Sequence, residues 1–520
     1  MRHLPLLPLL VLAGAATVQP ALAQPASSRP GPSPPAEPSG EIEVHQALAR
    51  ALEANPSVRV ALLEVVAARA GTRAAELARA PTLRADMSGA YQESLAGTGV
   101  GVTRNDSQTV SLGLGLDWTS DAGTVIAVDA SSGVRWRSTN RDPSTDLTVT
   151  IGPNYDVQLG TSLRQPLLRG AGRRSVRAAE REAAAAERRV GHERDVEVSA
   201  VVRDVLAAYW ELWYAERALE VQREAEALAA RQLEEARARV ELGSLAPVDA
   251  LRFASELASL RETRRSAEAS RVQARVALAE LLAVAPGSLR TAAPPPEAPA
   301  LPSLEALLAR VEATSPTLLA LDAGVEEAEE RLTAARDAAR ARLDAVADVG
   351  VYALWATDDA LAGAQLPDGR PAFVASGGLE LELPLGSAAA DARRDAAVAQ
   401  LAAARAQREQ QARALRARVR ERFEAVASAR DRVPLADETA SVAAELGEAE
   451  RARLELGTTT SADLLQAQQT AREAALRRLR VLVDATVAAQ GLAHEAGALL
   501  DRFSLRVPDA GELAEVDDVH

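Results

Sequence analysis

Two aspartates at matching positions of a duplicated motif are the strongest candidates for functional side chains in this sequence of 520 residues. The motif Arg-Val-Glu-Leu-Gly-Ser begins at Arg239 and is followed by Asp249, and its second copy, Arg-Leu-Glu-Leu-Gly-Thr, begins at Arg453 and is followed by Asp463. The shift between the copies is 214 residues, which indicates a tandem repeat. Each carboxylate follows a Leu-Gly break, where it can stabilise the free N–H groups of the next helix by about 0.3–1 kcal/mol.

No other arrangement of reactive side chains stands out. The five histidines are spaced for neither a metal site nor a catalytic triad: His3, His45, His192, His494 and His520. We therefore expect no enzyme activity, no cofactor and no metal site. The sequence has no cysteine, which excludes disulfides and a lipid anchor on an N-terminal cysteine. A net charge of −14 without a basic stripe argues against nucleic acid as a partner.

Long helical hairpins must position the two aspartates. The segment Arg173–Glu241 has one glycine and no proline, and its length corresponds to about 100 Å of helix. The return segment Val248–Ala285 has neither residue. In the second half we expect a helix from Ser387, a break at Pro434, more helix to Glu455, and a last helix over about Ser461–Leu500.

The first long helix carries an apolar stripe at helical spacing, which predicts packing against neighbouring helices. Its members are Val198, Val201, Val202, Val205, Tyr209, Leu212 and Val221. Tyr209, Trp210, Trp213 and Tyr214 continue the stripe, so we interpret them as a packing belt and not as a ligand cage. A dimeric coiled coil would also explain these helices, but it would leave the predicted strands unexplained.

Alternating apolar and polar residues predict strands suited to a membrane. In Val110–Trp118 one face is apolar, the other small or polar, and the length matches the 9–11 residues of a tilted membrane strand. Tyr155–Arg164 and Phe373–Leu383 repeat this design, and Leu83–Tyr91 and Leu343–Trp355 are weaker versions. A soluble β-sandwich with one wet face would show the same alternation.

An export signal favours an outer-membrane barrel over that sandwich. Arg2, an apolar core from Leu4 to Ala16 and the small residues Ala21–Ala23 predict a signal peptide over residues 1–23. A closed membrane barrel needs at least about eight strands, because open edges cannot face lipid. The chain offers four, or six if the longer first half forms an extra hairpin around Gly123. We therefore expect the protomer to oligomerise.

The predicted organisation is a linker at 24–40, a first repeat at 41–300, a second repeat at 301–503 and an acidic tail at 504–520. The first repeat holds strands over about 82–165 and a helical hairpin over about 172–285. The second holds strands over about 343–384 and helices over about 387–500. Each repeat opens with a short helix that ends near a proline, at Asn55-Pro56 and at Ser315-Pro316.

In this order the motifs resemble the TolC-type outer-membrane efflux protein family from Ile42 to about Phe503. The resemblance is carried by Ala47-Leu48 through Asn55-Pro56, Gln165–Gly170, Ala208–Leu212 and the two Leu-Gly-Ser/Thr turns. It implies an α+β membrane protein that forms a homotrimer in the outer membrane of a Gram-negative-type bacterium. Its protomers share one β-barrel in contact with outer-membrane lipid, and their helices form a long periplasmic coiled-coil α-barrel.

The resemblance also implies partners and a gate. The turns form periplasmic tips that meet a membrane-fusion adaptor, which links the channel to an inner-membrane transporter of the RND or ABC type. These tip residues are Leu242, Gly243, Ser244, Leu456, Gly457 and Thr458. Asp463 matches an acidic residue that narrows the channel in the family, and Gln466 stands where the family has a second such acid. Asp249 matches an acid that pairs with an arginine on the neighbouring tip in relatives, and Thr459 stands at the position of that arginine. We expect these four residues at the channel constriction, and we expect the contact that holds the channel closed to differ from the acid–arginine pair of relatives.

Two functions follow from these patterns. The first is a passive exit duct of a tripartite efflux or type I secretion system, and the alternative is a non-conducting coiled-coil envelope protein anchored by a β-barrel. A ring of three Asp463 carboxylates around a threefold axis would favour cations in the duct. The sequence leaves the cargo, the adaptor and the pump open.

Overall fold

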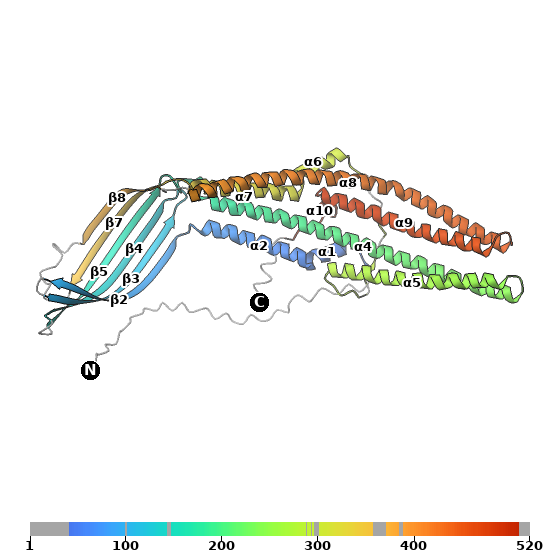
Figure 1. Ribbon diagram of the computed structural model, residues 1–520, viewed down its shortest axis with the longest axis horizontal. Coiled ribbons are helices and arrows are strands. Elements are labelled where there is room, and N and C mark those ends of the chain that lie inside the picture. Colours follow the sequence, from blue (N-terminus) through green and yellow to red (C-terminus); the bar gives the residue numbers. More distant parts are fainter. Residues whose placement is uncertain are drawn as a thin grey trace, which may run out of the picture.

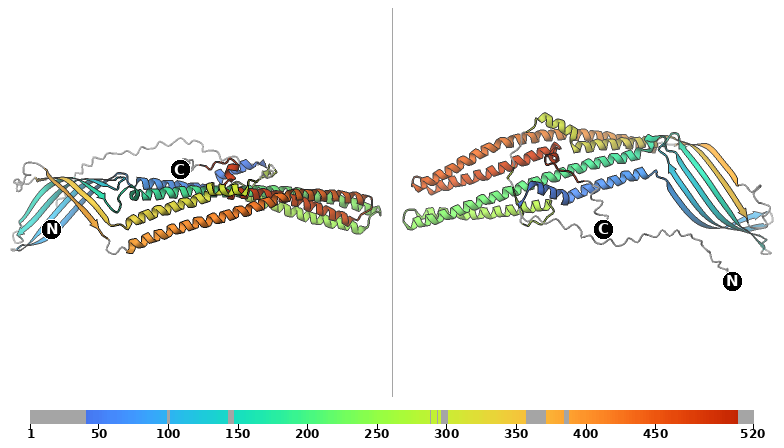
Figure 2. Two further views of the ribbon diagram at one scale, coloured as in Figure 1. Left: turned by 90° about the horizontal axis from the view of Figure 1, so that it is seen from above. Right: turned by 180° about the vertical axis from the view of Figure 1, so that it is seen from behind.

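The computed structural model describes residues 41–98, 101–142, 147–287, 289–292, 294–295, 301–356, 371–383 and 388–508. The predicted signal peptide and linker, and most of the predicted acidic tail, lie outside these residues. The molecule is elongated, with one large sheet at one end and long helices that extend from it (Figure 1). The views from above and from behind show the same division (Figure 2).

The sheet has six strands, each antiparallel to its neighbours, in the order β2–β3–β4–β5–β7–β8. The strands are β2 (Thr82–Thr98), β3 (Gly101–Thr119), β4 (Val125–Asp142), β5 (Leu147–Pro166), β7 (Arg342–Ala356) and β8 (Ala372–Glu382). The five predicted strands are confirmed, and the extra hairpin around Gly123 is the β3–β4 connection. Six strands per chain is therefore the correct alternative among the described residues, and β2 and β8 are the open edges.

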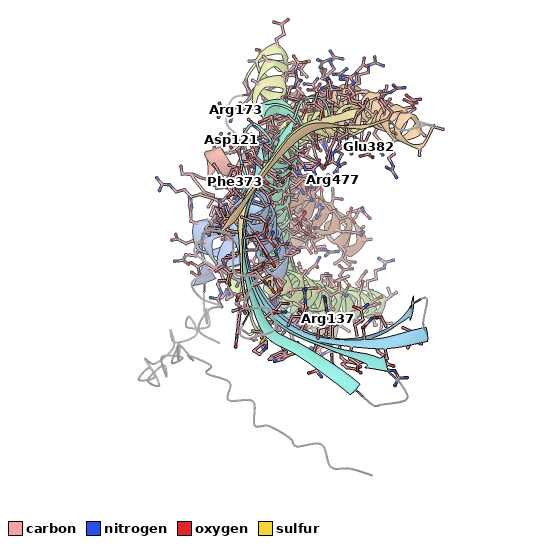
Figure 3. All side chains as sticks on the ribbon, turned by 90° about the vertical axis from the view of Figure 1, so that its left-hand side faces the viewer. Asp121, Arg137, Arg173, Phe373, Glu382 and Arg477 are labelled. Atoms are coloured by element: carbon pink, nitrogen blue, oxygen red, sulfur yellow. The ribbon has the colours of Figure 1, made fainter. Side chains whose placement is uncertain are left out.

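The register places apolar side chains of all six strands on one face. Leu83 of β2 pairs with Leu116 of β3, which pairs with Val128 of β4. Exposed aromatic residues lie towards both ends of this face: Tyr91, Trp136, Tyr155 and Phe373 at one end and Trp118 at the other. The sheet is curved, with Phe373 on its convex side and Arg137 and Glu382 on its concave side (Figure 3).

The concave face is polar and bears ion pairs that cross the strands. Arg164 of β5 lies 3.0 Å from Asp344 of β7 and 2.6 Å from Glu380 of β8, measured from Nη1 to the carboxylate oxygens. Arg84 of β2 lies 2.8 Å from Asp117 of β3. The contacts of Arg164 link the two halves of the chain, because β5 belongs to the first half and β7 and β8 to the second.

Two long helical hairpins follow the strands, as predicted. The first comprises α4 (Ala178–Glu241), preceded by the short α3 (Arg173–Val176), and α5 (Pro247–Leu281). The second comprises α8 (Ala388–Glu455) and α9 (Ser461–Glu495). No helix in the described part of the chain is both long enough and apolar enough to cross a membrane.

Shorter elements complete each half. The first half has β1 (Glu41–Ile42), α1 (Val44–Ala54), α2 (Pro56–Leu77) and β6 (Arg290–Thr291), which pairs with β1. The second half has α6 (Leu304–Thr314), α7 (Pro316–Ala338) and α10 (Leu499–Arg502). The predicted boundary at Asn55-Pro56 separates α1 from α2, where Asn55 caps α2 by accepting a hydrogen bond from the Ser57 N–H at 2.9 Å. Pro316 is likewise the first residue of α7, but the preceding Ser315 makes no side-chain cap.

The predicted helix break at Pro434 is wrong, because α8 continues through this residue. Proline removes one helical hydrogen bond, but Pro434 is exposed, so the carbonyl that loses its partner lies on the solvent side of the helix. Packing holds α8 on both sides of it, through the buried Val426 and Ala443. An ion pair from Asp437 to Arg478 of α9 adds to this packing. Tertiary contacts thus outweigh the local preference.

The aromatic residues of α4 form the predicted packing belt. Tyr209 and Trp210 are 0% and 2% exposed, and their rings meet edge to face at 4.8 Å within the main apolar cluster. The Tyr209 hydroxyl donates a hydrogen bond to the Ile42 carbonyl at 2.9 Å. Tyr214 lies at the margin of this cluster, with the Arg480 guanidinium 5.3 Å from its ring centroid. This region anchors the helices from which the tips project.

Candidate gating site at the helical tips

The two tips have the same backbone structure. Gly243 and Gly457 each have φ +72°, a left-handed conformation that glycine adopts at little cost. In the first tip the Ser244 N–H donates to the Arg239 carbonyl at 2.9 Å, and in the second the Thr458 N–H donates to the Arg453 carbonyl at 2.9 Å. Both are Schellman motifs, which end a helix and turn the chain. The duplicated motif therefore encodes a duplicated turn.

The two turns lie at the end of the molecule opposite the sheet (Figure 1), and each carries one exposed leucine. Leu242 is 82% exposed and Leu456 is 79% exposed. Ser244 and Thr458 are also exposed, but each hydroxyl donates a hydrogen bond to a carbonyl of its own helix at 3.1 Å. Each tip thus exposes one leucine side chain, and its hydroxyl group is hydrogen-bonded within the turn.

Asp463 is held by the start of α9. Its Oδ2 accepts hydrogen bonds from the Thr460 hydroxyl at 2.6 Å and from the Thr460 N–H at 3.2 Å. In return the Asp463 N–H donates to the Thr460 hydroxyl at 3.2 Å, which completes a capping box. The hydrogen bonds from Thr460 lower the pKa of Asp463 below its usual value. The carboxylate is therefore charged, exposed and committed to its own helix.

Asp249 joins the two tips. Its Oδ1 accepts a hydrogen bond from the hydroxyl of Ser461 in α9 at 2.7 Å, and Arg252 lies 3.2 Å from the same oxygen. Ser461 is 4% exposed, and the Asp249 side chain is 21% exposed. The carboxylate is thus mostly covered, and its partner on the opposite hairpin is a serine.

Thr459 and Gln466 take no part in that contact. The Thr459 hydroxyl lies 2.8 Å from Glu450 and 3.3 Å from Asp463, so it bridges two acids of the second hairpin. Gln466 is exposed, and its backbone carbonyl accepts a hydrogen bond from the Thr470 hydroxyl at 2.9 Å. Of the four predicted gating residues, the structure brings Thr459 and Asp463 together and places Asp249 beside Ser461.

Further contacts between the hairpins lie behind the tips. Glu256 of α5 and Arg472 of α9 form an ion pair of 3.3 Å, with side chains 25% and 18% exposed. The apolar cluster around Phe253 extends to Leu454 and Leu465 of the second hairpin. A cavity of about 50 Å³ between the tips is lined by residues of both hairpins, Ser461 among them. The tips of one chain are therefore packed together.

Sequence reasoning missed Ser461, Glu256 and Arg472. Ser461 stands where the first copy of the repeat has Pro247, so the duplication gives no signal for it. The pair Glu256–Arg472 joins residues that are 216 positions apart, beyond the range of any local pattern. Within the described residues, no group of three or more histidines and acids is arranged to hold a metal ion.

Comparison with known proteins gives a consistent result. The family model described as "Outer membrane efflux protein" matches residues 120–284 and 307–498. The chain is similar in fold to the open state of the Neisseria gonorrhoeae outer-membrane channel MtrE, at 19% identity and a TM-score of 0.63, with 88% of this chain and 89% of that chain covered. No curated protein matches the sequence.

Two further solved structures share this fold. The Campylobacter jejuni outer-membrane channel CmeC has 14% identity and a TM-score of 0.62, with 91% of this chain and 88% of that chain covered. The Vibrio cholerae outer-membrane protein VceC has 16% identity and a TM-score of 0.60, with 89% of this chain and 97% of that chain covered. At these identities the likeness is one of fold.

Proposed function

Because the chain belongs to the outer membrane efflux protein family, we propose that it is the outer-membrane channel of a tripartite efflux or type I secretion system. Three copies form a passive exit duct, and a periplasmic adaptor with an inner-membrane pump opens it. In this proposal residues 41–300 and 301–503 are the two repeats of each protomer.

The observation that carries the proposal is the open, two-faced sheet. Among the residues that the structure describes, its β2 and β8 edges are unpaired in one chain, and a membrane admits sheets only as closed barrels. Three copies of the six described strands give a barrel of eighteen, within the range of known outer-membrane barrels. The apolar convex face then meets lipid, and the polar concave face lines the duct.

The dimensions of the apolar face support this placement. On β3 it runs from Val110 to Trp118, eight residue steps or about 27 Å along the strand. With the usual tilt of 35–45° this corresponds to a band of roughly 20 Å, near the height of the apolar belt of such barrels. The aromatic residues at both ends stand where interfacial girdles lie.

The helices supply the periplasmic part of the duct. α4 has 64 residues and α8 has 68, so each extends for about 100 Å from the region below the sheet. Their tips are the proposed contact with the adaptor, through Leu242 and Leu456. The bond between Asp249 and Ser461 is the proposed latch that holds the two tips of a protomer together.

Two measurements on one detergent-purified sample test the proposal: its conductance in planar bilayers and its mass in detergent. A trimer with discrete conductance steps is the expected result. A stable monomer or dimer that never conducts would contradict it and favour a structural envelope protein. An Asp463→Ala variant tests the acidic ring: it should lower cation preference, and an unchanged reversal potential would contradict that part of the proposal.

A further inference from the structure

Arginines gather where the sheet meets the helices. Arg79 lies between α2 and β2, and Arg173, Arg174 and Arg177 lie at α3 and the start of α4. Asp121, in the turn between β3 and β4, is 2.7 Å from Arg79, 2.6 Å from Arg177 and 3.4 Å from Arg173. We call these four arginines the junction cluster.

The fold fixes the turn that carries Asp121. Gly123 has φ +90°, and a Cβ placed on it would lie 2.4 Å from the Gly170 carbonyl oxygen. The Gly172 N–H donates to the Ala122 carbonyl at 3.3 Å. The hydrogen bonds from Arg177 and Arg79 lower the pKa of Asp121 to about 2, so its carboxylate is charged and holds these two guanidinium groups in place.

The junction cluster keeps unused positive charge. Its four arginines contact two carboxylates, Asp121 and Glu180, which leaves an excess of two positive charges in a chain whose net charge is −14. Arg173 is 72% exposed and makes one long contact. Arg174 is exposed and has no carboxylate partner within the described ranges. Both guanidinium groups therefore have donors available to a ligand.

The junction cluster borders the apolar face of the sheet. Trp118 is 44% exposed and is the last residue of β3 on that face, three positions before Asp121. Leu167, 46% exposed, follows the end of β5. Seen along the long axis, Asp121 and Arg173 lie on the same convex side as Phe373, away from Arg137 and Glu382 (Figure 3). Arg173 and the Asp121 turn thus lie on the outer side, beside the apolar face.

We propose that the junction cluster binds the phosphate of an anionic phospholipid in the periplasmic leaflet of the outer membrane. The inference rests on the proposed function, since it needs the sheet to lie in that membrane. Guanidinium groups donate paired hydrogen bonds to phosphate, and the adjacent apolar surface receives the acyl chains. Arg79 and Arg177 support the turn, while Arg173 and Arg174 contact the headgroup.

Native mass spectrometry of the full chain tests the inference, after reconstitution in equal parts of phosphatidylglycerol and phosphatidylcholine. The variant is Arg173→Gln with Arg174→Gln, which leaves the contacts of Arg79 and Arg177 with Asp121 intact. The control is Arg231→Gln with Arg237→Gln, the same charge change at exposed positions near the far end of α4. Wild type and control should retain phosphatidylglycerol preferentially, and the variant should lose this preference by about fivefold per arginine.

Equal retention of the two lipids by the wild type would overturn the inference, as would an equal loss in the control. Release of the lipid by excess inorganic phosphate would assign the site to free phosphate and also overturn it. Conductance of the same samples separates the two proposals. Wild-type channels that conduct without lipid preference would refute the lipid site and leave the duct standing.

Discussion

Replacing Ser461 with alanine should loosen the tips and raise the open probability of the channel. The substitution removes the hydroxyl that donates to Asp249 at 2.7 Å and leaves the backbone of α9 unchanged. Tips that are less firmly joined within a protomer separate more readily. The expected change is therefore in gating, with little change in the conductance of the open state.

The size of the effect follows from the burial of the two partners. Hydrogen bonds to charged groups contribute about 1.5–3 kcal/mol. The Asp249 side chain is 21% exposed and keeps its contact with Arg252, which favours the low end of this range. A loss of about 1.5 kcal/mol corresponds to roughly a tenfold shift between the joined and separated tips.

Single-channel recording in planar bilayers measures this shift as open probability. Ser244→Ala is the matched control, because the Ser244 hydroxyl donates within its own turn to the Arg239 carbonyl. A cycle with Asp249→Ala isolates the pair, because alanine has no oxygen to accept from the Ser461 hydroxyl and the double variant should behave like the stronger single variant. If Ser461→Ala matches the wild type, or if Ser244→Ala opens the channel equally, the latch assignment is wrong.

Three other variants test separate parts of the structure. Asp463→Ala removes a capping box and should speed amide hydrogen exchange at the start of α9, by a local cost of about 1 kcal/mol; unaltered exchange would rule out the cap. Gly123→Ala places a Cβ in a left-handed conformation and against the Gly170 carbonyl, so it should lower the free energy of unfolding by about 1–3 kcal/mol, measured by thermal unfolding. Gly89→Ala is the control and should be nearly neutral, because the space around Gly89 is open. Burial lowers the pKa of His494 below its usual 6.5, so its stabilising effect is full above pH 6.5 and falls as the pH drops through the lower folded value. The His494→Asn variant should show a smaller drop in melting temperature between pH 7.5 and pH 5.5 than the wild type, and an equal drop would contradict this reasoning.

The predictions that held rest on local patterns. Alternation with a period of two marked the strands, because each strand of this sheet has one apolar and one polar face. The Leu-Gly turns were predictable because glycine is the residue that best accepts a φ of +72° after a helix. The break at Pro434 failed because packing along α8 outweighs one lost hydrogen bond.

The contacts at the tips were beyond sequence reasoning. The bond between Asp249 and Ser461 joins residues 212 positions apart, and only the packing of two hairpins brings them together. The resemblance pointed to Thr459 as the position facing Asp249, two residues from the serine that makes the contact. The junction cluster was missed for the same reason, since Arg79 and Arg177 meet at Asp121 from separate segments.

The open edges of the sheet also constrain how the protein matures. A lone chain carries unpaired N–H and C=O groups along β2 and β8, which is costly in lipid and invites pairing with any other exposed strand. The helices, by contrast, form their backbone hydrogen bonds within themselves. In the proposed trimer, entry into the membrane and joining of the copies are therefore coupled steps. The rate of assembly should then rise steeply with the concentration of chains, and both edges need protection until the copies meet.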